Sequence, residues 1–127
     1  MDVVRNGDLL SLQIEGRGFL GMGELTSKLF NANGGVYPMI IPKKGSRLPN
    51  DFYNLCIFEV ELGSDYSKQG ENCLYGESVR LKHVTTGKYL SISNLTSSES
   101  SDRFVCQFAV DRTPSTNMFI IPRYKTR

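Results

Sequence analysis

The chain has 127 residues, of which 39% are hydrophobic and 22% are charged, and its formal net charge is +2. This length predicts a single domain, 1–127, and the composition excludes both an intrinsically disordered chain and a membrane protein. No apolar run approaches the ~20 residues of a membrane-spanning helix, so we expect no direct membrane insertion. The small net charge does not indicate nucleic-acid binding.

The N-terminus and the cysteines both indicate a cytoplasmic location. Residues 1–8 include an acid where a signal peptide would be basic, and they lack the apolar core of such a peptide. The chain has three cysteines, Cys56, Cys73 and Cys106, in no metal-ligand spacing. An odd number of cysteines without that spacing predicts reduced thiols.

Alternating apolar and polar residues predict eight short strands and no helix of ordinary length. In the first half these strands are residues 9–15, 19–22, 36–41 and 55–62. In the second half they are residues 78–84, 89–93, 104–110 and 117–122. Polar or glycine-containing turns and loops are predicted at 16–18, 42–54, 63–72, 86–88, 94–102 and 113–116. Residues 24–33 could form a brief helical turn, but 33–35 are a stronger signal for a β-turn.

The residue pattern also predicts which face of some strands is buried and which strand lies at the edge of a sheet. The inner-face residues are Leu10, Leu12 and Ile14 in the first strand and Cys56, Phe58, Val60 and Leu62 in the fourth. In the second strand, Gly21 and Gly23 indicate a bulge or the close approach of another segment. Pro38 cannot donate a ladder hydrogen bond, so we expect the third strand at the edge of a sheet.

Residues 75–94 have a degraded copy in residues 6–23. The matched pairs are Gly7 with Gly76, Asp8 with Glu77, Leu10 with Val79, Leu12 with Leu81 and, after a slip of one residue, Phe19 with Tyr89, Leu20 with Leu90 and Met22 with Ile92. Each copy contains an alternating strand, a turn with glycine and a return strand. This internal repeat predicts two four-stranded lobes, about 6–62 and about 75–124.

The pieces of the repeat follow an order that resembles a known family. They are Gly7 and Asp8 near the N-terminus, Gly18 in the return strand, Pro42 to Lys44 ahead of Phe52, 56–60 (CIFEV), 75–90 (YGESVRLKHVTTGKYL) and 117–127 (NMFIIPRYKTR). This order resembles the MIR-type β-trefoil modules of protein mannosyltransferases and of the inositol trisphosphate and ryanodine receptors. The similarity is closer to the extreme N-terminal domain of the inositol trisphosphate receptors. The resemblance implies an all-β, β-trefoil-like fold, with two of three four-stranded lobes evident.

Two departures from that family concern the lobes. The receptors insert a long helical arm where this chain has only residues 63–72, and their trefoil has a third lobe. Two lobes leave strand edges and apolar faces without the partner that closure would supply. We therefore expect another protein chain, a second copy, or a further segment to cover the open side.

The sequence offers little for catalysis, a cofactor or a metal. The only histidine, His83, lies on the same alternating face as Val79 and Leu81, which favours a core position over a general base. Nucleophile, phosphate-loop and paired-histidine motifs are not found. Glu59, Glu61 and Asp65 are better explained as solvent charges than as a cation site. We expect no enzymatic activity, no catalytic residue, no cofactor and no metal.

Three groups of basic residues could bind an anion. Arg80, Lys82 and Lys88 could form a basic face on the second hairpin, although the resemblance carries over no ligand residue to them. The other two groups are Lys43, Lys44 and Arg47, and Arg123, Lys125 and Arg127. We interpret both as solvated loop or terminal charges in preference to an anion or nucleic-acid site.

The preferred functional hypothesis is a non-enzymatic protein-interaction or scaffolding module. The resemblance implies a regulatory N-terminal domain of a calcium-release channel, at the cytosolic face of the endoplasmic reticulum, involved in calcium signalling. A second version is a small subunit of a larger assembly, such as a cytoskeletal one. The alternative function is a trefoil that recognises an inositol phosphate or a glycan.

Overall fold

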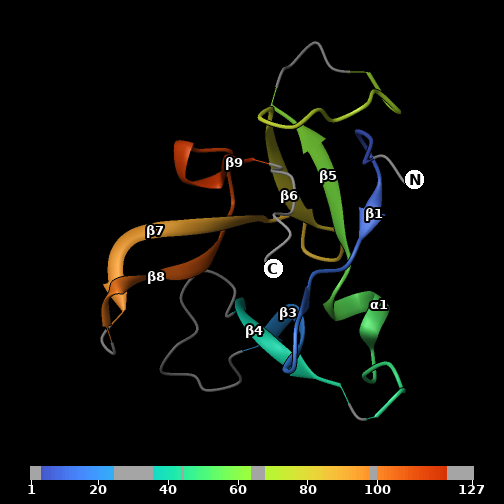
Figure 1. Cartoon of the computed structure of the whole chain (residues 1–127), viewed down its shortest axis with the longest axis vertical. Coiled ribbons are helices and arrows are strands. Elements are labelled where there is room, and N and C mark those ends of the chain that lie inside the picture. The colour runs from blue at the N-terminus through green and yellow to red at the C-terminus, as the bar shows by residue number, and fades with distance from the viewer. Residues whose placement is uncertain (1–3, 25–35, 44, 64–67, 98–99, 120–127) are drawn as a thin grey trace, which may run out of the picture.

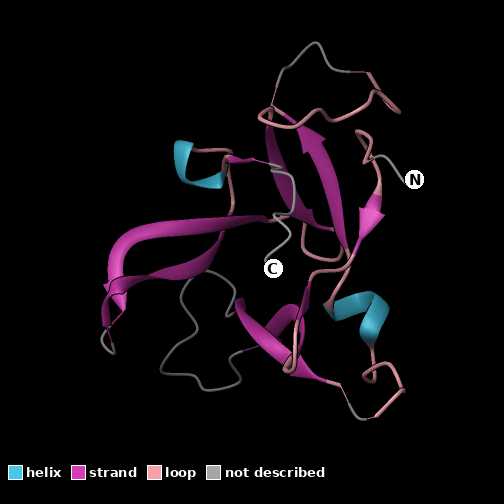
Figure 2. Cartoon of the chain, viewed as in Figure 1, coloured by secondary structure: helices cyan, strands magenta, loops and turns pink. Residues whose placement is uncertain are grey.

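The computed structural model describes residues 4–24, 36–43, 45–63, 68–97 and 100–119. These residues form strands in two antiparallel sheets, with two short helices (Figures 1 and 2). The strands are β1 (Leu9–Leu10), β2 (Gln13–Ile14), β3 (Gly18–Glu24), β4 (Val36–Pro42), β5 (Phe58–Leu62), β6 (Ser78–His83), β7 (Tyr89–Ser97), β8 (Ser100–Ala109) and β9 (Met118–Phe119). The helices are α1 (Phe52–Leu55) and the 3-10 helix η3 (Pro114–Thr116). The predicted all-β class is confirmed.

The smaller sheet has the strand order β2-β3-β4. Its longest ladder joins β3 to β4, from Gly18 opposite Pro42 to Glu24 opposite Val36. Since β4 is an outer strand of this sheet, the expected edge position of Pro38 is confirmed. Gly21 in β3 also meets the expectation of a close approach, because a Cβ atom there would lie 2.9 Å from both the Leu55 carbonyl oxygen and the Cys56 Sγ.

The larger sheet has the order β1-β5-β6-β7-β8, and β9 pairs with β6 beside β7. The central ladder between β5 and β6 runs from Phe58 opposite His83 to Leu62 opposite Val79. At its start β6 pairs with β9, and near its end it pairs with β7. Figure 1 shows β7 and β8 extending together away from β5 and β6.

The two sequence copies share one pairing scheme. In the first copy, residues 9–14 pair at their start with the last strand, β5, and at their end with β3. In the second copy, β6 pairs at its start with the last strand, β9, and near its end with β7. The middle strands also pair in both copies, β3 with β4 and β7 with β8. The repeat is therefore present in the hydrogen-bonding pattern as well as in the sequence.

Three predicted segments differ from the structure. The strand predicted at 9–15 is divided into β1 and β2, because its two ends pair in different sheets. The loop predicted at 42–54 ends early, because α1 begins at Phe52 and delays the next strand until Phe58. The loop predicted at 94–102 is wrong at both ends, because the ladder between β7 and β8 continues past a register shift. The turn signals at 24–35 and the end of the last strand lie largely outside the described residues.

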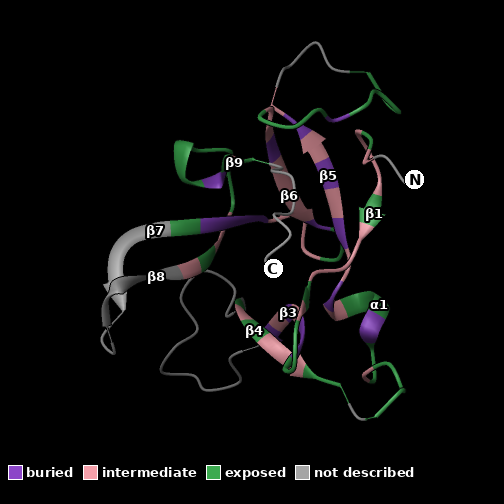
Figure 3. Cartoon of the chain, viewed as in Figure 1, coloured by how far each residue is buried: buried purple, intermediate pink, exposed green. Residues whose placement is uncertain are grey.

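The core contains two apolar clusters, and β5, much of which is buried (Figure 3), contributes Val60 and Leu62 to one of them. One cluster is Val60, Leu62, Cys73 and Val79, and the other is Phe19, Phe52 and Cys56. The predicted inner face of the fourth strand is confirmed, since Cys56, Phe58, Val60 and Leu62 are all buried. Burying each large apolar side chain contributes about 1.5–3 kcal/mol.

Candidate functional site

Within the described part of the chain, three strands of the larger sheet, β1, β8 and β9, each pair with one other strand, and β1 and β9 are the two that flank the β5–β6 ladder. β1 pairs with β5, and β9 pairs with β6. Figure 1 shows these two strands on opposite sides of the β5–β6 ladder. Each exposes a large apolar side chain, since Leu9 is 64% exposed and Phe119 is 63% exposed. Unpaired edges with exposed apolar residues are a site at which another chain can add.

The inner face of the same sheet is incompletely covered. Leu10 of β1, Leu81 of β6 and Met118 of β9 contact the cluster around Val60 and Val79, but they are only half-buried. We call these three residues, together with the strands β1 and β9, the open side. Covering it would remove further apolar surface from water, which favours association.

His83 is completely buried, as its alternating face predicts. Its Nε2 lies 2.9 Å from the Leu55 carbonyl oxygen, and its Nδ1 lies 3.1 Å from the Thr86 Oγ1. Because a carbonyl oxygen only accepts, Nε2 carries the proton, and the Thr86 hydroxyl can donate to Nδ1. The Thr86 Oγ1 also accepts from the backbone N–H of Lys88. His83 thus connects α1 to the β6–β7 turn and leaves no free ring nitrogen for a substrate.

The structure brings only part of the predicted basic face together. Arg80 and Lys82 project from one side of β6, whereas Lys88 lies in the following turn, where its carbonyl oxygen accepts from the His83 backbone N–H. Across the ladder, Arg80 is opposite Glu61 and Lys82 is opposite Glu59. The Arg80 Nη1 lies 3.6 Å from a Glu61 carboxylate oxygen. Acids opposite both bases weaken the attraction of this face for an anion.

Glu61 is the centre of a polar network that the sequence did not indicate. Arg112 donates from Nε and Nη2 to the two carboxylate oxygens of Glu61, at 2.9 and 2.5 Å. Tyr89 donates its hydroxyl to the same carboxylate, and the Arg112 guanidinium lies 5.9 Å from the centre of the Tyr89 ring. These hydrogen bonds to Glu61 and Tyr89 raise the pKa of Arg112 above its ordinary value. The network joins β5, the start of β7 and the segment after β8.

Of the acidic residues considered as ligands for a cation, Glu61 forms ion pairs with Arg80 and Arg112. Asp65 lies outside the described residues. Among the residues that the structure describes, no group of three or more potential ligands could hold a metal ion. Neither helix in the described ranges has the length and apolar character that crossing a bilayer requires.

All three cysteines are free thiols, as predicted. Burial raises the pKa of the Cys56 and Cys73 thiols, and the nearby acids Glu77, Asp8 and Glu71 raise that of Cys73 further. A raised pKa lowers the reactive thiolate fraction at neutral pH.

We expect Cys56 and Cys73 in the folded chain to react with iodoacetamide at pH 7 at least about tenfold more slowly than in the urea-unfolded chain. The rate should rise as the pH is raised, because more thiolate forms. Mass spectrometry of peptides from timed labelling measures this for each cysteine. Equal rates for Cys56 in the folded and unfolded chains would contradict its buried position.

Comparisons with protein-family models and with curated proteins found no match to this chain.

Proposed function

We propose that the chain is a non-enzymatic interaction module that binds another protein chain through its open side. The observation that carries this proposal is the exposure of Leu9 and Phe119 on two strands that each have one unpaired edge within the described residues. Large apolar residues at such edges favour strand addition by a partner over exposure to water. A partner strand would gain main-chain hydrogen bonds and cover apolar surface in one step.

A β-trefoil-like arrangement is part of this proposal. The shared pairing scheme of the two copies supports it, and the β5–β6 ladder joins the last strand of one copy to the first strand of the next. By the same rule, a third unit would pair its first strand with β9 and its last strand with β1. The bound chain would then take the place that a third lobe occupies in a closed trefoil.

The resemblance described above suggests two settings for such a module. One is the regulatory N-terminal part of a calcium-release channel, and the other is a small scaffolding subunit of a larger assembly in the cytoplasm. Both settings require contacts with neighbouring proteins and no catalytic centre. Recognition of an inositol phosphate is less well supported, because Glu59 and Glu61 lie opposite the bases on β6.

The experiment compares the purified chain with a variant that carries Leu9→Lys and Phe119→Lys. Both side chains are well exposed, so the double variant should fold normally. The wild-type chain should bind an apolar dye and associate with itself or with one stoichiometric partner, as native mass spectrometry would show. The double variant should lose the dye and the association. Tyr53→Lys with Val84→Lys is the control, because these residues are also exposed but lie near α1, away from β9.

Two outcomes would contradict the proposal. One is a well-folded, strictly monomeric wild-type chain that binds neither dye nor partner. The other is equal binding by the wild-type chain and the Leu9/Phe119 double variant.

A further inference from the structure

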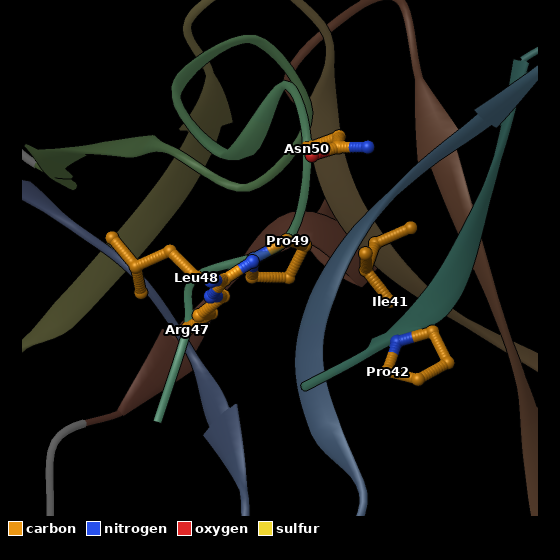
Figure 4. Close-up of a pocket in the computed structure, with 6 residues that line it drawn as sticks. All are labelled: Ile41, Pro42, Arg47, Leu48, Pro49 and Asn50. Atoms are coloured by element: carbon orange, nitrogen blue, oxygen red, sulfur yellow. The ribbon is translucent and has the colours of Figure 1, made fainter. Parts of the chain in front are cut away.

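A separate pocket lies where β4 ends and the following loop folds back towards α1 (Figure 4). Its volume is about 430 Å³. It is lined by Ile41, Pro42, Arg47, Leu48, Pro49 and Asn50. Figure 4 shows Arg47 and Pro49 on one side and Ile41 and Pro42 on the other. Most of these residues are exposed, so the pocket is open to solvent.

The walls of the pocket are mainly apolar, and one wall is anchored in the core. Ile41 packs against the buried cluster of Phe19, Phe52 and Cys56, which ties one wall to the core. Pro42 and Pro49 have restricted backbone angles and no N–H group, so they offer apolar surface without a donor that needs a partner. Leu48 is half-exposed and widens the apolar surface at the rim.

Two polar side chains, Arg47 and Asn50, complete the lining. The Arg47 guanidinium and the Asn50 amide have no hydrogen bond or ion pair within the part of the chain that the structure describes. None of the described residues that line the pocket is acidic. The planar guanidinium matches a carboxylate group, to which it can donate two parallel hydrogen bonds. The amide of Asn50 can both donate to and accept from a peptide backbone.

We propose that this pocket binds a partner peptide in which an apolar side chain is followed by a carboxylate. The apolar side chain enters between Ile41 and Pro49, and the carboxylate pairs with Arg47. The volume lies in the range of ligand sites, and an open, apolar-walled pocket suits an extended peptide. A polyphosphate would need several converging cations, whereas Arg47 is the single charged residue of the lining among the residues that the structure describes. Lys43 is exposed nearby and increases the attraction for an acidic segment.

This proposal shares with the proposed function the view that the chain acts through protein contacts, but it concerns a different surface. The open side is formed by β1, β6 and β9, whereas the pocket is formed by the end of β4 and residues 47–50. The Leu9/Phe119 double variant should therefore bind the pocket peptide normally. Failure of one proposal leaves the other intact.

The test titrates the full chain with two peptides, Ser-Ser-Leu-Asp-Leu-Ser and its asparagine counterpart Ser-Ser-Leu-Asn-Leu-Ser, and follows binding by NMR chemical shifts. Both peptides are acetylated at the N-terminus and amidated at the C-terminus, so the aspartate is the only carboxylate. The aspartate peptide should bind saturably and shift the amide signals of Ile41, Leu48 and Asn50. We expect Arg47→Gln to weaken this binding by about tenfold or more, the usual loss for a charged hydrogen-bonded pair. Leu48→Ser should weaken it as well, by removing apolar contact.

The matched control is Lys68→Gln, which removes one positive charge from an exposed side chain in the β5–β6 connection. It should bind the aspartate peptide like the wild-type chain, and thermal unfolding should show that every variant is folded. Equal binding of the two peptides, or unchanged binding by Arg47→Gln, would overturn the proposal. Inositol hexakisphosphate is the third probe: if it shifts the pocket signals in an Arg47-dependent way and the peptide does not, the pocket is an anion site and the peptide assignment is wrong.

Discussion

Replacing His83 with alanine should lower the free energy of unfolding by about 3–5 kcal/mol, because it combines a core cavity with lost hydrogen bonds. The ring is fully buried and packs against the rings of Phe58 and Phe108, with its centroid 5.4 Å from each. Its removal also leaves the Leu55 carbonyl oxygen without the side-chain donor that connects α1 to β6. Urea unfolding followed by circular dichroism measures the change.

His83→Phe separates the two contributions. Phenylalanine fills the space between the neighbouring rings but cannot donate to Leu55 or accept from Thr86, so its cost should fall below that of alanine. We expect it to retain about 1–3 kcal/mol of destabilisation from the unsatisfied polar groups. A loss below about 1 kcal/mol for His83→Ala would be inconsistent with a fully buried, hydrogen-bonded ring.

His83 and β5 show what the sequence can predict. Side chains alternate along a strand, so a run of apolar residues at every second position identifies the buried face without knowledge of the partner strand. This reasoning placed His83 beside Val79 and Leu81, and it identified the four buried residues from Cys56 to Leu62. The edge position of β4 followed from Pro38, whose missing N–H group is a property of the residue alone.

The errors concern features that depend on distant partners. The serine-rich segment 94–102 predicts a loop, but pairing with β8 extends β7 to residue 97. The bidentate contact between Arg112 and Glu61 joins residues 51 positions apart, and no local pattern marks either of them as a pair. In the same way, the sequence identified Arg80 and Lys82 as bases on one face but could not show that acids of β5 lie directly opposite.

The pocket around Arg47 was not predicted for the same reason: it depends on residues from separate segments coming together. In the sequence, Lys43, Lys44 and Arg47 are three basic residues in a polar loop, and a solvated loop is the simplest interpretation. In the structure, Arg47 lines the pocket and Lys43 is exposed outside it, whereas Lys44 lies outside the described residues. The combination of Arg47 with Ile41 depends on the loop folding back onto β4, which no local spacing predicts.

Gly18→Ala should be among the most destabilising changes in the smaller sheet, with a cost of about 3–4 kcal/mol from backbone strain and steric overlap. Gly18 has a φ of 144°, a conformation that residues with a side chain rarely adopt. A Cβ atom at this position would also overlap the backbone carbonyl oxygen of Ile41 on β4. Backbone atoms of a paired strand cannot rotate away as a side chain can, so the β3–β4 ladder itself would have to shift.

Gly16→Ala is the matched control, because Gly16 lies in the turn just before β3 and also has a positive φ, 76°. Among the described residues, no atom of another segment lies within 4 Å of the position that the alanine methyl group would take, so only the left-handed backbone penalty of about 1–2 kcal/mol applies. Thermal and urea unfolding should therefore separate the two alanine variants clearly. Equal stability of both would show that the β3–β4 contact at Ile41 is looser than the structure indicates. Because Ile41 and Pro42 also form one wall of the Arg47 pocket, Gly18→Ala should weaken peptide binding there, whereas Gly16→Ala should leave it unchanged.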